Sequence, residues 1–151
     1  MAVDDTTLSN VKTLVIDGDG CIDLAGVSSS PTLTRLRITC GNIATCVSPH
    51  MFPNLKYMYL STNALKAFEF VAPTLAELVV EIDPTHPQEK LCKILEDVLT
   101  FKVDGAFRYF PSVARLEIIY NPLAPGASST FTQNIARERA SPRFQLIATP
   151  L

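Results

Sequence analysis

Three aspartates lie close together near the start of the chain, and carboxylates at short spacing can act as nucleophiles, general acids or cation ligands. Asp17, Asp19 and Asp23 fall in the segment LVIDGDGCID, which begins with the apolar residues Leu14–Ile16. A calcium loop would need a ligand at the intervening position, where Cys21 stands, and a glutamate at its twelfth position, which is absent. The spacing therefore does not predict a calcium site.

The other residues that could do chemistry are dispersed along the chain. His50 and His86 are isolated, and no serine cluster has a nearby histidine that could act as its base. Gly18 and Gly20 lack the third glycine and the lysine of a phosphate-binding loop. The cysteines form neither a CxxC pair nor the spacing of zinc ligands, so we expect reduced thiols and no metal or cofactor. They are Cys21, Cys40, Cys46 and Cys92.

The segment LVIDGDGCID resembles the first motif of haloacid-dehalogenase-type phosphatases, an apolar strand that ends in D-x-D-G. The resemblance implies a magnesium-dependent phosphatase with Asp17 as the nucleophile and Asp19 as the general acid. Such an enzyme also needs a later lysine and a further acidic motif, but no lysine has a distinguishing context and Asp83 stands alone. We therefore expect no enzyme and keep the phosphatase as the alternative. The favoured interpretation is a turn at residues 17–20 that follows a strand.

A short motif with the apolar spacing L-x-x-L-x-L recurs five times along the chain. Proline stands two residues before the first apolar position in four of the five motifs, at Pro31, Pro53, Pro73 and Pro111. Because proline fixes its own φ and has no backbone N–H, it suits a turn that enters a strand. The apolar triplets are Val11, Leu14, Ile16; Leu33, Leu36, Ile38; Leu55, Met58, Leu60; Leu75, Leu78, Val80; and Val113, Leu116, Ile118.

These motifs resemble the leucine-rich repeat, whose pattern is LxxLxLxxNxL. Residues Leu55 to Leu65 fit best, with Met58 in place of one leucine and Asn63 at the asparagine position. The irregular period and the leading Pro-[Asn/Thr/Ser]-Leu are similar to the repeat region of fungal and plant F-box proteins, especially in Leu65 to Leu78. The resemblance implies an α/β fold: a short leucine-rich-repeat solenoid with a curved parallel sheet of about five strands, an irregular convex side and one clear helix. It also implies substrate recognition for a ubiquitin ligase, although no F-box is seen.

The segments between the motifs predict the convex side of this fold. Leu65, Phe68 and Phe70 repeat the apolar spacing and predict a second extended segment. In the longest interval, apolar residues three and four apart predict a helix: Leu91, Ile94, Leu95, Val98 and Leu99. Thr85 and Gln88 have the spacing of a capping box, Pro87 fits the first turn, and Gly105 is expected to end the helix.

The last part of the chain is expected to cap the repeats. Residues 1–123 form the predicted solenoid, and residues 124–151 form a loop and a C-terminal capping segment of the same domain. Phe131 to Ala140 is expected to be a short helix with Arg137 and Arg139 solvated. Pro142 then introduces Phe144–Ile147 as a final strand.

Alternation along parallel strands would place the residues between the leucines on the concave face. The centre of that face is charged and aromatic, and Val79 shares it. Arginine and tyrosine are enriched in interface hot spots, so we predict that this face binds a protein or peptide. The alternative is that these side chains only stabilise neighbouring strands, with Arg37 bound to Asp17, Arg35 and Arg37 stacked on the tyrosines, and Glu117 bound to Arg115. The predicted binding residues are Arg35, Arg37, Tyr57, Tyr59, Glu77, Glu81, Arg115 and Glu117.

Composition bounds the remaining possibilities. The chain has 151 residues, 47% hydrophobic and 19% charged, and a formal net charge of -2, which indicates one folded domain and gives no basis for nucleic-acid binding. Its apolar runs are too short for a membrane span, and its acidic start does not resemble a secretory signal, so we expect a cytoplasmic or nuclear protein. We see no cap before Leu8, which predicts self-association through an uncapped N-terminal repeat.

Overall fold

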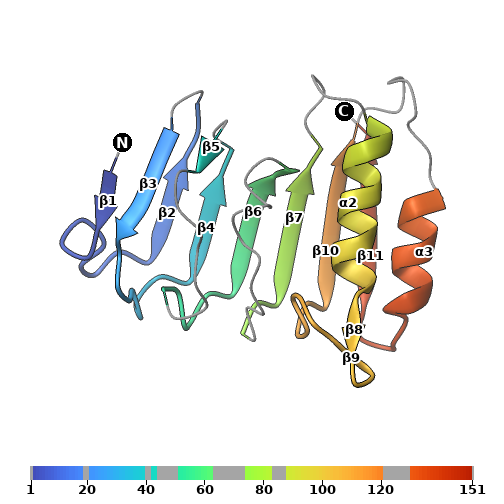
Figure 1. Ribbon diagram of the computed structural model, residues 1–151. Helices are drawn as coiled ribbons and strands as arrows, with labels where there is room; N and C mark the ends of the chain where they lie inside the picture. Colours follow the sequence, from blue (N-terminus) through green and yellow to red (C-terminus); the bar gives the residue numbers. More distant parts are fainter. Residues whose placement is uncertain are drawn as a thin grey trace.

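The computed structural model describes residues 2–18, 21–39, 42–43, 51–62, 74–82, 88–120 and 130–150. These residues form an α/β fold in which a six-stranded parallel sheet is joined by two helices, α2 (Gln88–Thr100) and α3 (Thr130–Glu138) (Figure 1). The strands follow one another across the sheet in chain order. They are β2 (Thr13–Ile16), β4 (Arg35–Ile38), β6 (Tyr57–Ser61), β7 (Glu77–Glu81), β10 (Arg115–Tyr120) and β11 (Gln145–Pro150).

Shorter strands lie outside this sheet. At the N-terminal end, β1 (Ala2–Asp4), β3 (Cys21–Gly26) and β5 (Asn42–Ile43) form a second parallel sheet in the order β1-β3-β5. At the other end, β8 (Lys102–Val103) and β9 (Ala106–Phe107) form an antiparallel hairpin directly after α2. Figure 1 shows α2 in front of β10 and β11, so the helices cover one face of the large sheet at its C-terminal end.

A tight turn with proline at its second position precedes several strands of the large sheet. In each turn, the backbone N–H of the fourth residue donates to the carbonyl of the first, at 3.2 to 3.4 Å. Proline is preferred at this position because its fixed φ matches the turn. The side chain of Asn54, which follows Pro53, donates to the carbonyl of Pro31 at 2.8 Å and so links two successive turns. The bonded pairs are Leu33–Ser30, Leu55–Phe52, Val113–Phe110 and Phe144–Ser141.

One carbonyl before each strand accepts two amides from the next strand of the sheet. The carbonyl of Lys12 accepts the N–H groups of Thr34 and Arg35 at 3.0 and 3.1 Å. The same double acceptance recurs at the carbonyls of Thr34, Lys56 and Ala76. At the last pair, β10 and β11, the carbonyl of Ala114 accepts the N–H of Gln145 alone, at 2.8 Å. The register is the same across all six strands, so that Leu14, Leu36, Met58, Leu78, Leu116 and Leu146 lie opposite one another.

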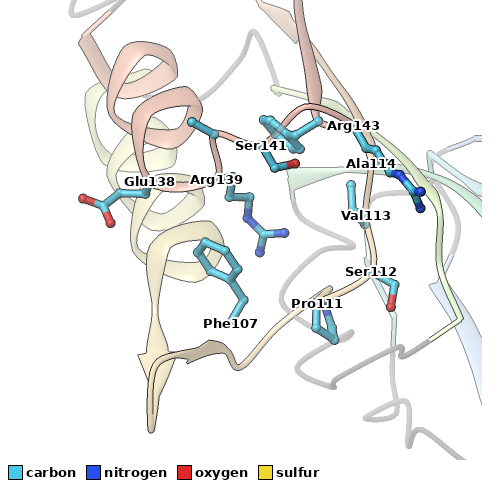
Figure 2. A pocket seen from close by; sticks show the side chains of 11 residues that line it. Phe107, Pro111, Ser112, Val113, Ala114, Glu138, Arg139, Ser141 and Arg143 are labelled. Carbon is cyan, nitrogen blue, oxygen red and sulfur yellow. The ribbon is translucent and has the colours of Figure 1, made fainter.

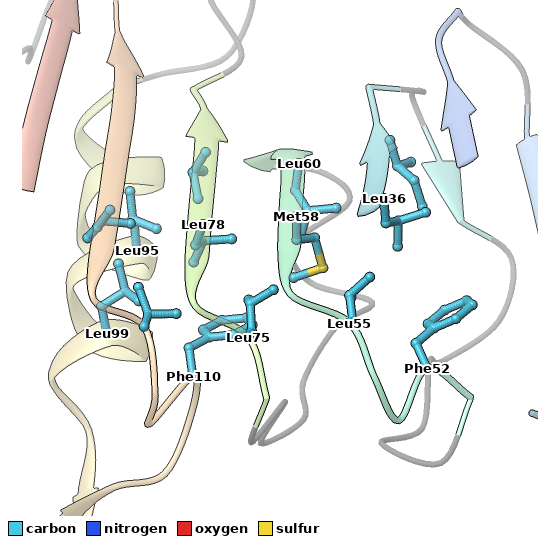
Figure 3. Packing of buried hydrophobic residues seen from close by; sticks show 14 of the residues in the cluster. Leu36, Phe52, Leu55, Met58, Leu60, Leu75, Leu78, Leu95, Leu99 and Phe110 are labelled. Carbon is cyan, nitrogen blue, oxygen red and sulfur yellow. The ribbon is translucent and has the colours of Figure 1, made fainter. Parts of the chain in front are cut away.

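The apolar triplets predicted from the sequence form the core on the helical side of the sheet (Figure 3). Val11 and Leu14 are partly buried, and every other member of the triplets is buried. Leu95 and Leu99 of α2, and Phe52 and Phe110 from the turns, complete this layer. Leu91 is buried and Ile94 and Val98 are half-buried, as expected for the face of α2 that packs on the sheet.

The C-terminal segment extends the sheet. The expected final strand is β11, which pairs with β10 along its whole length and raises the number of strands from the expected five to six. The expected short helix is α3, so the described residues include a second helix beside the one clear helix expected from the sequence. Gln145 is opposite Arg115 in the register of β10 and β11. The connection from the turn that begins at Ser141 to Gln145 is one residue shorter than the connection from the turn that begins at Phe110 to Arg115.

The expectation that Gly105 ends the helix is wrong. Helix α2 ends at Thr100, whose hydroxyl donates to the carbonyl of Glu96 at 2.7 Å. Asp104 and Gly105 instead form the two-residue loop between β8 and β9, with φ of 53° and 81°. Positive φ at both positions is typical of the type I′ turn that Asp-Gly favours in hairpins.

The N-terminal segment covers part of the core beside β2, in contrast to the uncapped repeat that we expected. Strand β1 pairs with β3, and both Val3 and Leu8 are buried. The backbone N–H of Leu8 donates to the carbonyl of Asp4 at 3.1 Å, which holds the turn between them. Strand β2 is still the outer strand of the large sheet, and self-association through this end stays a prediction. Four other predicted features, Thr85, Pro87, Asn63 and the segment Leu65–Phe70, lie outside the described residues.

Arg139 is buried, although we expected it to be solvated; its side chain is part of the packing at the end of α3. Only 5% of the residue is exposed, and its Nε, Nη1 and Nη2 atoms donate to the carbonyls of Leu99, Phe110 and Tyr109 at 2.7, 2.8 and 2.7 Å. Its guanidinium carbon lies 4.2 Å from the ring centroid of Phe107 (Figure 2). Burial lowers the pKa of Arg139 to about 10, so the side chain is still cationic at neutral pH. Arg139 therefore joins α2, α3 and the segment before β10.

We expect Arg139→Met to lower the free energy of unfolding by about 2–5 kcal/mol, because three carbonyls would lose their donor in a buried place. Arg137→Met, at an exposed position of α3, is the matched control and should change stability by no more than about 0.5 kcal/mol. Urea unfolding followed by circular dichroism measures both. Equal stability of the two variants would show that the three contacts contribute nothing.

Candidate binding surface

The structure brings all eight predicted binding residues to one face of the large sheet. This face, which we call the open face, is opposite the leucine core, because side chains alternate along each strand. The eight predicted residues on it are called the polar strip.

Cross-strand pairing orders the face in rows. The first row is Thr13, Arg35, Tyr57, Glu77, Arg115 and Gln145, and the second is Val15, Arg37, Tyr59, Val79, Glu117 and Ile147. Ser61, Glu81, Ile119 and Thr149 form the third.

Two arginines of β4 stack on two tyrosines of β6. The guanidinium carbon of Arg35 lies 4.2 Å from the ring centroid of Tyr57, and that of Arg37 lies 4.1 Å from the ring centroid of Tyr59. Each arginine is directly opposite its tyrosine in the register, so the stacking follows from the pairing of the strands. A cation over an aromatic face is attracted by the ring quadrupole. The centre of the open face therefore carries two fixed cation–aromatic pairs.

Acidic side chains contact both members of the second pair, Arg37 and Tyr59. Arg37 Nε lies 3.3 Å from Asp17 Oδ1, and the same carboxylate oxygen accepts the hydroxyl of Thr39. The hydroxyl of Tyr59 donates to Glu81 Oε2 at 2.7 Å. Asp17, Arg37, Tyr59 and Glu81 thus form one connected group that spans four strands or their ends. The expected contact between Arg37 and Asp17 is present.

Arg115 does not bind Glu117, contrary to the alternative interpretation of the sequence. Arg115 Nη1 lies 3.6 Å from Glu77 Oε2 on the neighbouring strand. The register explains this choice, because Arg115 is directly opposite Glu77, whereas Glu117 lies two residues further along the same strand. Glu117 Oε1 instead accepts a long hydrogen bond of 3.4 Å from the hydroxyl of Thr149 on β11.

Arg35 differs from the other two arginines of the polar strip. Its residue is exposed, and among the described residues no carboxylate lies within ion-pair distance of its guanidinium. Its contact is the ring of Tyr57, which leaves the N–H edge of the guanidinium able to donate. A planar donor edge held by a ring is suited to bidentate contact with a carboxylate. Arg35 is therefore the side chain of the strip best placed to meet an acidic group.

The contacts of the polar strip shift the pKa of Tyr59 and of the neighbouring Asp17. Burial and the hydrogen bond to Glu81 raise the pKa of Tyr59 to about 12, although the charge of Arg37 acts in the opposite direction. The hydrogen bond from Thr39 and the hydrogen bond and charge of Arg37 hold the pKa of Asp17 below its usual value. Tyr59 is thus neutral and Asp17 ionised at neutral pH, as their contacts require.

Asp17 was also the proposed nucleophile of the alternative phosphatase. Its carboxylate is held by Arg37 and Thr39, while its expected partner Asp19 lies outside the described residues. The described part of the chain contains no group of three histidines, cysteines or acidic residues that could hold a metal ion. Of the four cysteines, Cys92 is described as a free thiol; it is buried in α2, and burial raises its pKa.

Sequence reasoning missed two features of the open face. Val79 belongs to the second row but is only 3% exposed, so the strip has an apolar, covered position between Tyr59 and Glu117. The run Leu78-Val79-Val80 in the sequence was a signal that both faces of β7 are covered. The contact of Thr39 with Asp17 was also not recognised, because it depends on the register between β2 and β4.

Tyr59→Phe tests the connected group, since it removes the hydroxyl and keeps the ring over which Arg37 lies. An unfolded tyrosine ionises near pH 10, so a folded pKa of about 12 means that Tyr59 contributes stability that is complete below pH 10 and is lost as pH rises towards 12. We expect the variant to lose this part of the pH dependence. Because the hydrogen bond to Glu81 is also lost, its free energy of unfolding at neutral pH should be lower by about 0.5–1.5 kcal/mol. Absorbance at 295 nm should lose the component that titrates near pH 12; loss of one that titrates near pH 10 would contradict the assignment. Tyr57→Phe is the control.

Comparisons with known proteins give no match from which a role for this surface could be inferred. No protein-family model, no curated protein and no solved structure matches the chain. No described helix is long and apolar enough to cross a membrane. A function for the chain must therefore be argued from the polar strip and the fold that presents it.

Proposed function

We propose that this chain is a short leucine-rich-repeat solenoid that works as a non-catalytic interaction module and binds a protein or peptide through the polar strip. The observation that carries the proposal is the pair of arginine–tyrosine stacks at the centre of the open face, held at 4.2 and 4.1 Å. Arginine and tyrosine dominate interface hot spots because both bring a large contact area with few freely rotating bonds.

The geometry supports binding more than it supports a purely stabilising role. Ion pairs between exposed side chains contribute only about 0–1 kcal/mol to stability. In the strip such pairs instead hold the aromatic and cationic groups in fixed positions, which reduces the entropy lost when a partner binds. Arg35 keeps a donor edge that no described carboxylate uses. A partner segment with an acidic residue beside an apolar one would match Arg35 and the ring of Tyr57.

The repeat interpretation is supported by regular backbone contacts. The same proline turn and the same doubly accepting carbonyl recur before successive strands, and the register between strands is constant. Leucine-rich repeats are expected to stack in this way, each one contacting only its neighbours. The likeness to the repeat region of F-box proteins implies that the bound protein is a substrate, presented to a ubiquitin ligase in the cytoplasm or nucleus.

The experiment is affinity capture from a eukaryotic lysate with the wild type and the double variant Arg35→Ala, Tyr57→Ala. This pair carries the first stack but none of the ion pairs or hydrogen bonds that connect Arg37, Tyr59 and their acidic partners. We expect a partner captured by the wild type to bind the variant at least about tenfold more weakly, as truncation of a hot spot predicts.

The matched control is Lys90→Ala with Lys93→Ala, because both lysines are exposed on α2, in the layer on the other side of the sheet. The control should capture the same partner as the wild type, and all three proteins should have the same far-UV dichroism. A partner that binds the strip variant as tightly as the wild type would refute the proposed site. Equal loss in both variants would also speak against it.

A further inference from the structure

A pocket of about 420 Å³ lies where β10 and β11 begin, beside the C-terminal end of α3 (Figure 2). It shares no residue with the polar strip. Pockets that hold small ligands have volumes of roughly 300–1,000 Å³, so this one could accept a molecule about the size of one ring with a short substituent. Its apolar lining consists of Phe107, Pro111, Val113, Ala114 and Phe144.

The polar lining of the pocket is mainly basic or hydroxylic. Ser112 and Ser141 come from the two proline turns that precede β10 and β11, and Arg143 from the second of these turns is exposed. Arg139 comes from the end of α3, and Figure 2 shows its guanidinium group directed between Phe107 and Val113. The two turns and the helix end thus converge on one apolar hollow.

The guanidinium of Arg139 carries a charge that no carboxylate neutralises among the described residues. Its three hydrogen-bond partners are carbonyl oxygens, and the ring of Phe107 lies against it. These contacts use one N–H on each nitrogen, whereas each Nη atom has two. A desolvated cation with only dipoles around it creates a positive potential in the neighbouring cavity.

One acidic residue, Glu138, also lines the pocket, and its charge is matched nearby. Glu138 Oε2 lies 3.6 Å from Lys102 Nζ on β8. With this pair neutral, the ionisable residues of the lining leave the charges of Arg139 and Arg143. The surrounding chain has the same sign, because residues 130–150 contain three arginines and one glutamate, although the whole chain has a formal net charge of -2.

From these observations we propose that the pocket binds a small organic anion, in which a carboxylate or phosphate is attached to a compact apolar group. The apolar group would contact Phe107, Val113 and Phe144, and the anion would lie towards Arg139 and Arg143. An inorganic anion lacks the apolar part, and a neutral analogue lacks the charge, so each should bind worse than the complete ligand. The proposal is independent of the polar strip.

The probe is phenylacetate, titrated into the ¹⁵N-labelled chain and followed by amide chemical shifts. Phenylacetamide is the neutral match, and inorganic phosphate tests the anion without an apolar group. We expect saturable shifts at the amides of Val113, Ala114, Arg139 and Arg143 with phenylacetate, and binding at least about tenfold weaker with the other two probes.

Variants assign the anion contact. Arg143→Ala removes an exposed side chain of the lining and should weaken phenylacetate about tenfold, whereas Arg137→Ala, at an exposed position of α3 outside the lining, should leave binding unchanged. Arg139→Lys keeps a cation at the buried position and should retain weaker binding if the variant is folded. The proposal is overturned if phenylacetamide or phosphate binds as tightly as phenylacetate, if Arg143→Ala binds like the wild type, or if no saturable shift occurs at the pocket.

Discussion

The register of the first five strands of the large sheet depends on one carbonyl before each of β2, β4, β6 and β7, which accepts two amides from the start of the next strand. The contact at Lys12 recurs at Thr34, Lys56 and Ala76, always to the first residues of the following strand. Because side chains alternate, a slip of one residue would exchange the two faces of a strand. The repeated contact prevents this slip, and it therefore determines both that the leucines meet in the core and that the charged side chains meet on the open face.

The polar strip is a consequence of this register. Arg35 lies on Tyr57 and Arg115 reaches Glu77 because each pair is directly opposite across two strands. The same contacts support the sheet and would hold the side chains in place for the proposed partner, so the stabilising role and the proposed binding role are compatible. Cross-strand pairs contribute roughly 0.2–1 kcal/mol each, which is enough to fix a side chain and too little to explain so many charged groups in one place.

The features that follow from local spacing were predictable, and the features that depend on distant contacts were not. Spacing of apolar residues located the strands, the face of α2 and the residues of the polar strip. It could not show that Arg139 is buried, because its partners are carbonyls of α2 and of the segment before β10. It also assigned Gly105 to the end of α2, although Asp104-Gly105 is a hairpin signal in its own right. The partner of Arg115 required a register that composition does not contain.

The return of the chain to the large sheet after α2 explains the position of the buried Arg139. Along the chain, helix α2 and the β8–β9 hairpin lie between β7 and β10, which are neighbours in the sheet. Phe110 begins the turn that restores the register. Phe110 has a φ of 51°, which a bulky residue rarely adopts, and its side chain is fully buried. Its carbonyl accepts both the N–H of Val113 and Nη1 of Arg139. The arginine therefore stabilises the irregular backbone through which the inserted helix and hairpin rejoin the regular sheet, and the pocket beside it is a result of that junction.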